Sequence, residues 1–285
     1  MVLRHLASHW LRNTAREKLR EAAVGAVKEK LRDETEENKE LPEGHRADVA
    51  VLFALPVEAG GFEDIVRPRR WIEGEGFSVA FGMLHEKRIA IAITGTGREA
   101  AQTATEAILD AHKPAWVIST GFAGGLQEDL GLNDLILADA VLDIQGNKLR
   151  LDLRVDRAAL ESAKGVHAGA LLTVDRIVHA PGEKRALGEK TGALGVDMET
   201  LAVAETCRRR EVPFSAVRIV SDRMDDELPN ELKHLLSQKS TTRRLGAAVG
   251  AVFRKPSRVK DLWNLREKAI LASEKLGRYL SGLLR

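Results

Sequence analysis

The middle of the chain alternates between two patterns of apolar and polar positions. Short, nearly continuous apolar runs, such as 47–56 and 115–120, are typical of strands buried inside a sheet. Between them lie segments such as 98–113, where apolar residues recur every three or four positions, which is the helical period. Strands that alternate with helices predict an α/β domain with a mixed central β-sheet flanked by helices.

The same patterns place the individual elements. A hairpin is predicted over 77–97, with its polar turn at His85–Lys87. Further strands are predicted at 47–56, 115–120, 134–144, 169–178, 193–198 and 214–222, and helices at 98–113, 182–191, 199–210 and 230–240.

Both ends of the chain depart from this alternation. Residues 1–31 carry apolar side chains at helical spacing, and the hydrophilic stretch 32–46 that follows contains Pro and Gly, which is typical of a linker. Residues 241–285 read as two basic helices separated at Pro256. The predicted organisation is therefore an amphipathic helix plus linker at 1–46, an α/β domain at 47–240 and a basic helical C-terminal extension at 241–285.

Charge is distributed unevenly over these parts. The net charge of +2 over 285 residues combines +8 in 241–285, from eleven Lys and Arg against three Asp and Glu, with −7 in 47–240. An acidic central domain argues against nucleic acid as a partner. One cysteine, Cys207, excludes an internal disulfide and fits a reducing compartment. Since no apolar run approaches the roughly 20 residues of a membrane span, we expect a cytoplasmic protein.

Four polar or glycine-rich features follow predicted strands, and ligands of open α/β sheets bind at the carboxyl ends of strands. They are Pro56-Val57-Glu58, "STGFAGGL" at 119–126, "VDMET" at 196–200 and Ser221-Asp222. Each one alone has an ordinary explanation, because acids cap helices and glycines make tight turns. Together, and in this order, they indicate a ligand site.

The joint pattern resembles the nucleoside phosphorylase/nucleosidase superfamily, which includes purine nucleoside phosphorylases and methylthioadenosine/S-adenosylhomocysteine nucleosidases. The resemblance covers about residues 47–240. It rests on the segments "LFALPVEA", "TGTGREAA", "STGFAGGL", "GVDMETLAVA" and "VRIVSD".

The resemblance implies a role for each matching residue in cleaving an N-glycosidic bond. Asp222, held by Ser221, would be the general acid toward the purine, and Glu58 would activate water. Glu199 would bind the ribose hydroxyls, with Met198 against the sugar. The remaining substrate-binding residues implied are Phe122, Ala123 and Gly124 beside base and sugar, Ile177 and Val178 at the base, Arg218 near the attacking group, and Asp197 at the strand–helix junction, where it tunes the site.

The chemistry of the reaction requires these residue types. A purine is a poor leaving group unless it is protonated, so an acid must keep its proton near neutral pH, which burial of a carboxyl group achieves. A second carboxylate can accept hydrogen bonds from two neighbouring hydroxyls and so orient the sugar.

Departures from the phosphorylase pattern favour hydrolysis. Hexameric phosphorylases hold phosphate with an arginine and a serine, and Ser119 and Phe122 stand at those places here. Phenylalanine cannot bind phosphate, and Glu58 would repel it. Phosphorolysis remains the alternative, with Arg98 and Arg218 as candidate anion ligands, and a nucleoside-binding protein without turnover is a third reading. No cofactor is expected, with inorganic phosphate needed only by a phosphorylase, and no metal, since His167 and His179 are isolated and the central domain 47–240 contains no metal-ligand spacing.

A narrower resemblance concerns "VDMET", "SDRMDDELP" and the basic segment 253–269, which are similar to the hopanoid-associated subgroup. Its members act on adenosylhopane, a lipid-linked nucleoside. The basic helix 241–285 would then make a peripheral contact with an anionic membrane. The alternative is that the terminal helices pack on the core or on a second subunit. Members of the superfamily form dimers, trimers or hexamers, so the resemblance implies a homo-oligomer.

Overall fold

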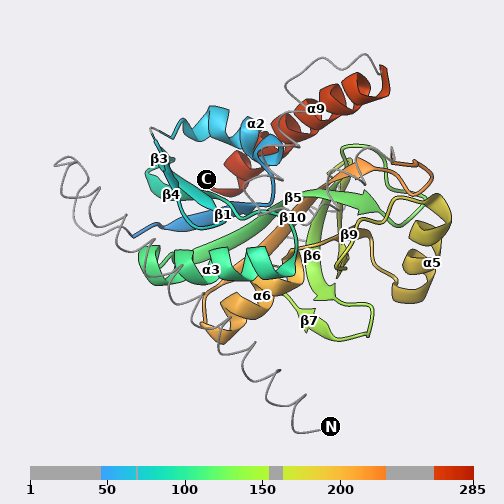
Figure 1. The fold of residues 1–285 in the computed structure, drawn as a ribbon, viewed down its shortest axis with the longest axis horizontal. Helices are drawn as coiled ribbons and strands as arrows, with labels where there is room; N and C mark the ends of the chain where they lie inside the picture. Colours follow the sequence, from blue (N-terminus) through green and yellow to red (C-terminus); the bar gives the residue numbers. More distant parts are fainter. Residues whose placement is uncertain (1–45, 69, 154–162, 229–259) are drawn as a thin grey trace, which may run out of the picture.

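The computed structural model describes residues 46–68, 70–153, 163–228 and 260–285. In this part of the chain one ten-stranded mixed sheet is covered by helices on both faces (Figure 1). The α/β fold predicted from the sequence is therefore confirmed. The predicted helix at 1–31, the linker, the helix at 230–240 and the segment before Pro256 lie outside the described residues.

The predicted elements within the described residues follow one another in the expected order, but the helix 56–66 and the short strands 71–73 and 148–150 were not predicted. The strands are β1 (Val49–Phe53), β2 (Trp71–Glu73), β3 (Ser78–Leu84), β4 (Lys87–Ile93), β5 (Trp116–Gly125), β6 (Leu135–Leu142), β7 (Lys148–Arg150), β8 (Val166–Thr173), β9 (Gly195–Asp197) and β10 (Phe214–Asp222). The helices are α2 (Pro56–Val66), α3 (Arg98–His112), α5 (Pro181–Thr191), α6 (Thr200–Arg209) and α9 (Lys260–Leu283).

Strand pairing gives the sheet a closed part and an open part. β5, β10, β6, β8 and β9 pair in a ring, because β10 hydrogen-bonds to both β6 and β5 and β9 pairs with both β8 and β5. β1 pairs with the first residues of β5 on the edge opposite β10, and the sheet continues from there through β4, β3 and β2. The first half of β5 therefore has β1 as its neighbour, and the last two residues have β9.

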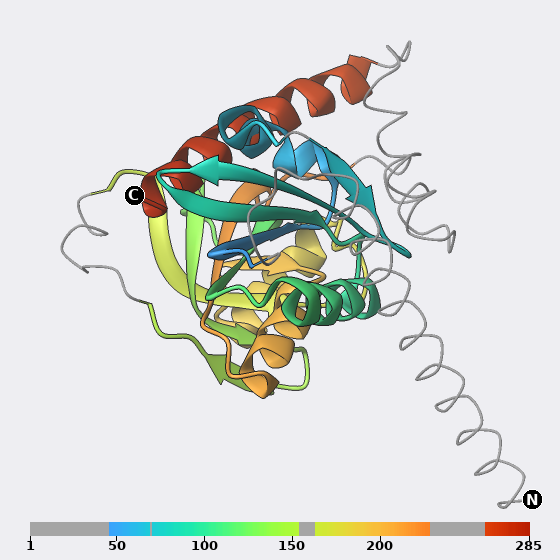
Figure 2. The same ribbon diagram turned by 90° about the vertical axis from the view of Figure 1, so that its left-hand side faces the viewer.

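The side chains of β1 show how the two faces are covered. Ala50 and Leu52 pack in the cluster that α3 and α6 cover, whereas Val51 and Phe53 pack against α2 and α9. Strand residues point to opposite faces in turn, so a strand buried on both sides must be apolar throughout. Figure 2 shows α9 and α2 on one side of the strands and α3 on the other.

Several strand boundaries differ from the prediction, and two of the differences concern the candidate site. The apolar strand predicted to end at 120 continues to Gly125, so "GFAGG" forms the second half of β5 and is not a loop. Its glycines leave room for close neighbours, which the pattern alone did not reveal. The strand predicted over 169–178 ends at Thr173, and residues 174–178 form a connection instead. The hairpin is confirmed, with His85 and Glu86 as its turn.

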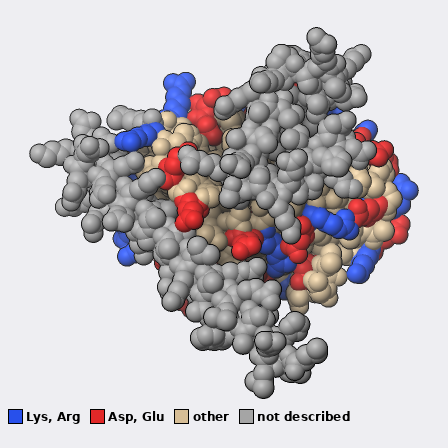
Figure 3. Space-filling model, in the orientation of Figure 1, with Lys and Arg blue, Asp and Glu red and all other residues tan. Residues whose placement is uncertain are grey.

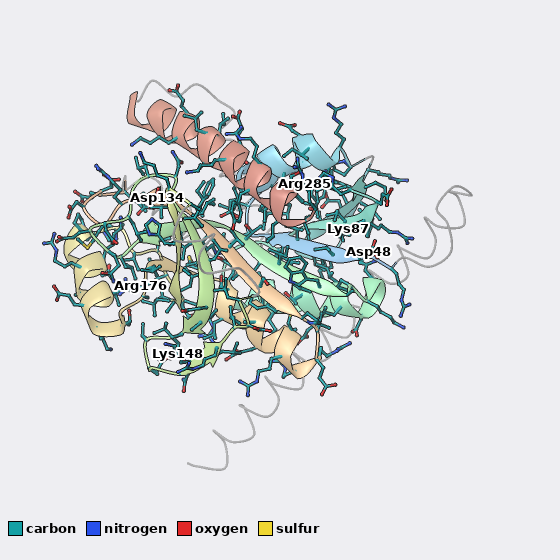
Figure 4. All side chains as sticks on the ribbon, turned by 180° about the vertical axis from the view of Figure 1, so that it is seen from behind. Asp48, Lys87, Asp134, Lys148, Arg176 and Arg285 are labelled. Carbon is teal, nitrogen blue, oxygen red and sulfur yellow. The ribbon has the colours of Figure 1, made fainter. Side chains whose placement is uncertain are left out.

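The C-terminal helix α9 packs along α2. A Cβ atom added to Gly277 would lie 2.5 Å from the backbone of Gly61, and one added to Gly61 would lie 2.3 Å from the carbonyl oxygen of Ser273. The two helices can approach this closely only because these positions lack side chains. Farther along, the Lys87 amine on β4 donates to the carbonyl oxygens of Leu284 and Arg285, and Figure 4 labels Lys87 and Arg285 side by side.

Replacing Gly277 with alanine is predicted to destabilise the fold by about 1–3 kcal/mol, because the added methyl group overpacks the contact with α2. A lower Tm and a lower urea midpoint would measure the loss. Gly282→Ala is the matched control on the same helix, since nothing lies within 4 Å of its added Cβ. There alanine should raise the stability through its better helix propensity. Equal stabilities of the two variants would contradict the close packing of α9 on α2.

The described surface carries both signs of charge. In Figure 3, Lys and Arg are interspersed with Asp and Glu on the side of the molecule where α5 lies. Within the residues searched, no helix is both long and apolar enough to cross a membrane.

Candidate active site

A pocket lies along one edge of β5, between the part that pairs with β1 and the part that pairs with β9. The β1–β5 pairing ends at Ser119 and the β9–β5 pairing begins at Gly124, so the backbone between them has no strand neighbour on that edge. The cavity has a volume of about 180 Å³. The residues that line it are Ala54, Leu55, Val57, Glu58, Thr96, Phe122, Ala123, Gly124, Arg176, Ile177, Val178, Val196, Asp197, Met198, Glu199, Ser221, Asp222, Leu228, Lys268, Ala269 and Ala272.

Glu58 reaches this gap from the first turn of α2. Pro56 begins the helix, a position that needs no N–H group, and the Glu58 carboxylate turns back to accept hydrogen bonds from the N–H groups of Ala54 and Leu55 at 2.9 and 2.8 Å. Its other oxygen, Oε1, accepts the Phe122 N–H at 2.9 Å. Glu58 therefore caps its own helix and also ties α2 to the unpaired edge of β5.

Gly121 makes this approach sterically feasible. Its φ is +139°, and a Cβ atom there would lie within 2.7–2.9 Å of the Glu58 carboxyl group. Burial raises the pKa of Glu58, although the nearby Arg218 guanidinium and the three backbone N–H groups oppose that shift. A raised pKa makes this carboxylate a stronger base. Since Oε2 accepts two N–H groups and Oε1 only one, Oε1 is the oxygen with a free lone pair.

Arg218 and Asp197 form a buried ion pair behind the pocket. Arg218 Nε donates to Asp197 Oδ2 at 2.8 Å, and the Arg218 side chain is 2% exposed. Its Nη2 donates to Ser119 and Thr200 at 3.1 and 2.7 Å. Asp197 also accepts hydrogen bonds from the hydroxyls of Thr173 and Thr200, so β8, β9, β10 and α6 meet at this pair. The network holds the arginine in place and neutralises its charge.

Glu199 begins helix α6, but its carboxyl group does not cap that helix. Oε1 instead accepts the N–H of Gly97 at 2.6 Å, from the turn before α3. Burial, and then the neighbouring Asp197 carboxylate, raise the pKa of Glu199 to about 8. Glu58, Asp197 and Glu199 all act on Arg218 electrostatically. Three carboxyl groups thus surround one cation on this side of the pocket.

Asp222 stands at the end of β10, across the pocket. Its Oδ1 accepts the Ser221 hydroxyl at 2.6 Å, and its Oδ2 accepts the amine of Lys184 from α5. Burial raises the pKa of Asp222, and Lys184 and Ser221 oppose part of that rise. Gly124 leaves room for the carboxyl group, because a Cβ atom there would lie 3.2 Å from Oδ2. The pocket therefore separates a buried acid from a cluster of three carboxyl groups.

The family comparison agrees with this geometry. A model of the phosphorylase superfamily matches residues 48–255 of the chain. The chain belongs to the phosphorylase superfamily.

Several proteins similar to this chain are nucleosidases. The 5'-methylthioadenosine/S-adenosylhomocysteine nucleosidases of Staphylococcus haemolyticus and Oceanobacillus iheyensis are 26% and 23% identical over 195 residues, which is 61% of this chain and 86% and 85% of theirs. The Helicobacter pylori nucleosidase of the same name superposes with a TM-score of 0.64 at 19% identity, over 85% of this chain and 99% of its own. Futalosine hydrolase of that organism superposes with a TM-score of 0.61 at 19% identity, over 83% and 97%.

The structure brings almost all of the predicted site residues of this superfamily member together. Those that line the pocket are Glu58, Phe122, Ala123, Gly124, Ile177, Val178, Asp197, Met198, Glu199, Ser221 and Asp222. Arg218 lies behind them and reaches the site through Asp197. Arg98, the other candidate anion ligand, is outside the lining and lies 3.9 and 3.8 Å from Asp175 and Glu205.

Two parts of the site were not predicted from the sequence. Lys184 lies in the helix predicted over 182–191 and was not singled out there, yet it is fully buried against Asp222. α9 adds Lys268, Ala269 and Ala272 to the lining, and its Ser273 hydroxyl donates to the carbonyl oxygen of Glu58 at 3.1 Å. Lys184 sits three residues past Pro181, in a helical first turn where a cation is unfavourable. That position was the available signal.

Metal ligands do not gather in the described residues. No group of three or more His, Cys, Asp or Glu side chains there could hold a metal ion. Arg176, labelled in Figure 4, lines the pocket and forms an ion pair with Glu183 of α5.

Proposed function

We propose that this protein is a nucleosidase that hydrolyses the N-glycosidic bond of a purine nucleoside or an adenosyl compound. The observation that carries the proposal is that the carboxyl groups of Asp222, Glu58 and Glu199 come from three separate elements and line one pocket. The nucleosidase relatives described above support the reaction class. No cofactor takes part, and the substrate is a small molecule.

The proposed steps assign one task to each group. Asp222 gives its proton to N7 of the purine as the bond between C1' and N9 breaks. Glu199 accepts the ribose hydroxyls and fixes the sugar. Glu58 takes a proton from water as the water oxygen attacks C1', and it uses the lone pair that Oε1 retains. The products are free base and free sugar, and solvent returns the proton to Asp222 and removes it from Glu58.

The charge of the site favours water over phosphate. Glu58, Asp197 and Glu199 surround Arg218, and the arginine already donates to Asp197, Ser119 and Thr200. A phosphate dianion beside Phe122 would lie next to the Glu58 carboxylate, and the Phe122 N–H is already bonded to Glu58. Placing it there would bring like charges together in a buried site, which is costly.

The sugar product tests this proposal directly. The protein is incubated with adenosine, 5'-methylthioadenosine or S-adenosylhomocysteine, with and without inorganic phosphate, and the sugar is identified by mass spectrometry. We expect free sugar at the same rate in both conditions. Formation of a sugar 1-phosphate that depends on phosphate would overturn hydrolysis in favour of phosphorolysis.

We further propose that the substrate carries an apolar group on its sugar, as adenosylhopane does. Ala269 and Ala272 of α9 line the pocket, while the neighbouring Ile270 and Leu271 are 41% and 53% exposed. α9 thus contributes apolar residues both to the pocket lining and to the exposed surface. The same assay with an adenosyl lipid in anionic vesicles measures this preference, and faster turnover of adenosine than of the lipid would count against it.

Location and assembly are proposals of the same kind. We propose a cytoplasmic homo-oligomer whose basic segment 241–285 touches anionic membrane surfaces. The charge of that segment, +8 by sequence, supports the membrane contact. Vesicle flotation of the full chain, with and without anionic lipid, measures it.

A further inference from the structure

Lys184 is the most unusual buried charge in the described part of the chain. Its side chain is 0% exposed, although a lysine ammonium loses much of its hydration energy on burial. It also lies in the first turn of α5, where the helix dipole disfavours a positive charge. Since both burial and the helix dipole destabilise this positive charge, neighbouring groups must stabilise it.

The compensation comes from three acceptors. Lys184 Nζ donates to Asp222 Oδ2 and to the carbonyl oxygens of Arg223 and Asp226, the latter two at 2.9 and 2.8 Å. An ammonium group has three hydrogens and a neutral amine has two, so three acceptors match the charged form. Lys184 thereby joins α5 to Asp222 and to the turn that follows β10.

From this arrangement we propose that Lys184 is a positioning residue that fixes the Asp222 carboxyl group toward the purine and stabilises the carboxylate that forms when Asp222 gives up its proton. The proposal rests on the proposed role of Asp222 as the acid. In the step considered, the proton leaves the Asp222 carboxyl group for N7, and the electron pair of the C1'–N9 bond moves onto the base. Asp222 then carries a negative charge beside the Lys184 ammonium, so their attraction grows as the reaction proceeds.

The other neighbours of Asp222 do not provide this charge. Ser221 is neutral, β5 and β9 present Gly124 and Val196, and Asp226 is itself acidic and raises the pKa of Asp222. Lys184 is the strongest of the groups that counter the effect of burial on Asp222. Its removal should therefore leave an acid that holds its proton more tightly and releases it less readily.

The test replaces Lys184 with methionine, which fills similar space without charge, and with glutamine, whose amide can still donate to the two carbonyl oxygens. Both variants should lower kcat for a purine nucleoside by about tenfold or more, but by less than the roughly 10²–10⁴-fold that general acid catalysis as a whole supplies, with little change in KM. The alkaline limb of the kcat profile should move to higher pH, because burial is then less opposed. The matched control is Arg185→Gln, on the same helix and paired with Asp225 of the same turn, but exposed.

A second substrate separates this role from a structural one. When a 4-nitrophenyl riboside is cleaved, the leaving group is 4-nitrophenolate, a stable anion that needs no proton from an acid. K184M and K184Q should therefore cleave this substrate at close to the rate of the unchanged protein. Equal losses on both substrates, or an unshifted alkaline limb, would overturn the proposal. If K184M does not fold, K184Q and the ratio of the two substrates decide the matter. An Asp222→Asn variant with full activity on purine nucleosides would instead refute the proposed function itself.

Discussion

Asp222→Asn is expected to lower kcat for purine nucleosides by about 10²–10⁴-fold while changing KM little. Asparagine fits the same space and its oxygen can accept the hydrogen bond from Lys184, but it has no acidic proton to give the base. In the unchanged protein kcat should fall as the pH rises through the pKa of Asp222, which burial raises, because only the protonated acid can act. The residual rate of the variant should lack this alkaline limb.

The control for this prediction is Asp225→Asn, three residues farther along the same turn. Its side chain is 69% exposed and pairs only with Arg185 among the described contacts. It should therefore leave kcat and the pH profile unchanged. If Asp222→Asn keeps full activity, the acid lies elsewhere. If the unchanged protein binds purine nucleosides but releases no base, it is a nucleoside-binding protein and not an enzyme.

The sequence predicted the fold and most of the site because both depend on local patterns. Apolar runs located every strand of the closed ring, and Glu58, Glu199 and Asp222 each stand at the junction of a strand with the next segment. What such patterns do not contain is which junctions meet. That information came from the family resemblance, and the pairings of β5 with β1, β9 and β10 show it in space.

Long-range contacts account for what was missed. Lys184 and Asp222 are 38 positions apart, and Ser273 meets Glu58 across 215 positions. The local sequence around these residues does not indicate either contact, except that Lys184 stands in a helical turn where a positive charge is unfavourable. The glycines of β5 were read as a loop, since nothing local shows that Gly121 makes room for a carboxyl group.

Glu58→Ala is expected to reduce kcat by about 10²–10⁴-fold and also to destabilise the protein. The activity falls because no base remains to take the proton from the attacking water. The stability falls because the N–H groups of Ala54, Leu55 and Phe122 lose their acceptor, and each buried unpaired group costs about 1–3 kcal/mol. Steady-state kinetics and thermal unfolding measure the two effects on the same sample.

Added formate links the two losses to one carboxylate. It can enter the space that the side chain leaves, accept the same N–H groups and take the proton from water, so it should restore part of kcat and raise the Tm of Glu58→Ala. Asp64→Ala, an exposed change on the same helix, should show neither the losses nor the response to formate. If formate raises the Tm of Glu58→Ala but leaves its kcat at the lowered level, Glu58 caps the helix and takes no part in catalysis. If formate restores both kcat and Tm, then one carboxylate both accepts the hydrogen bonds that hold α2 on β5 and activates the water. The unpaired edge of β5 beside Phe122 would then serve the reaction because it admits this carboxylate.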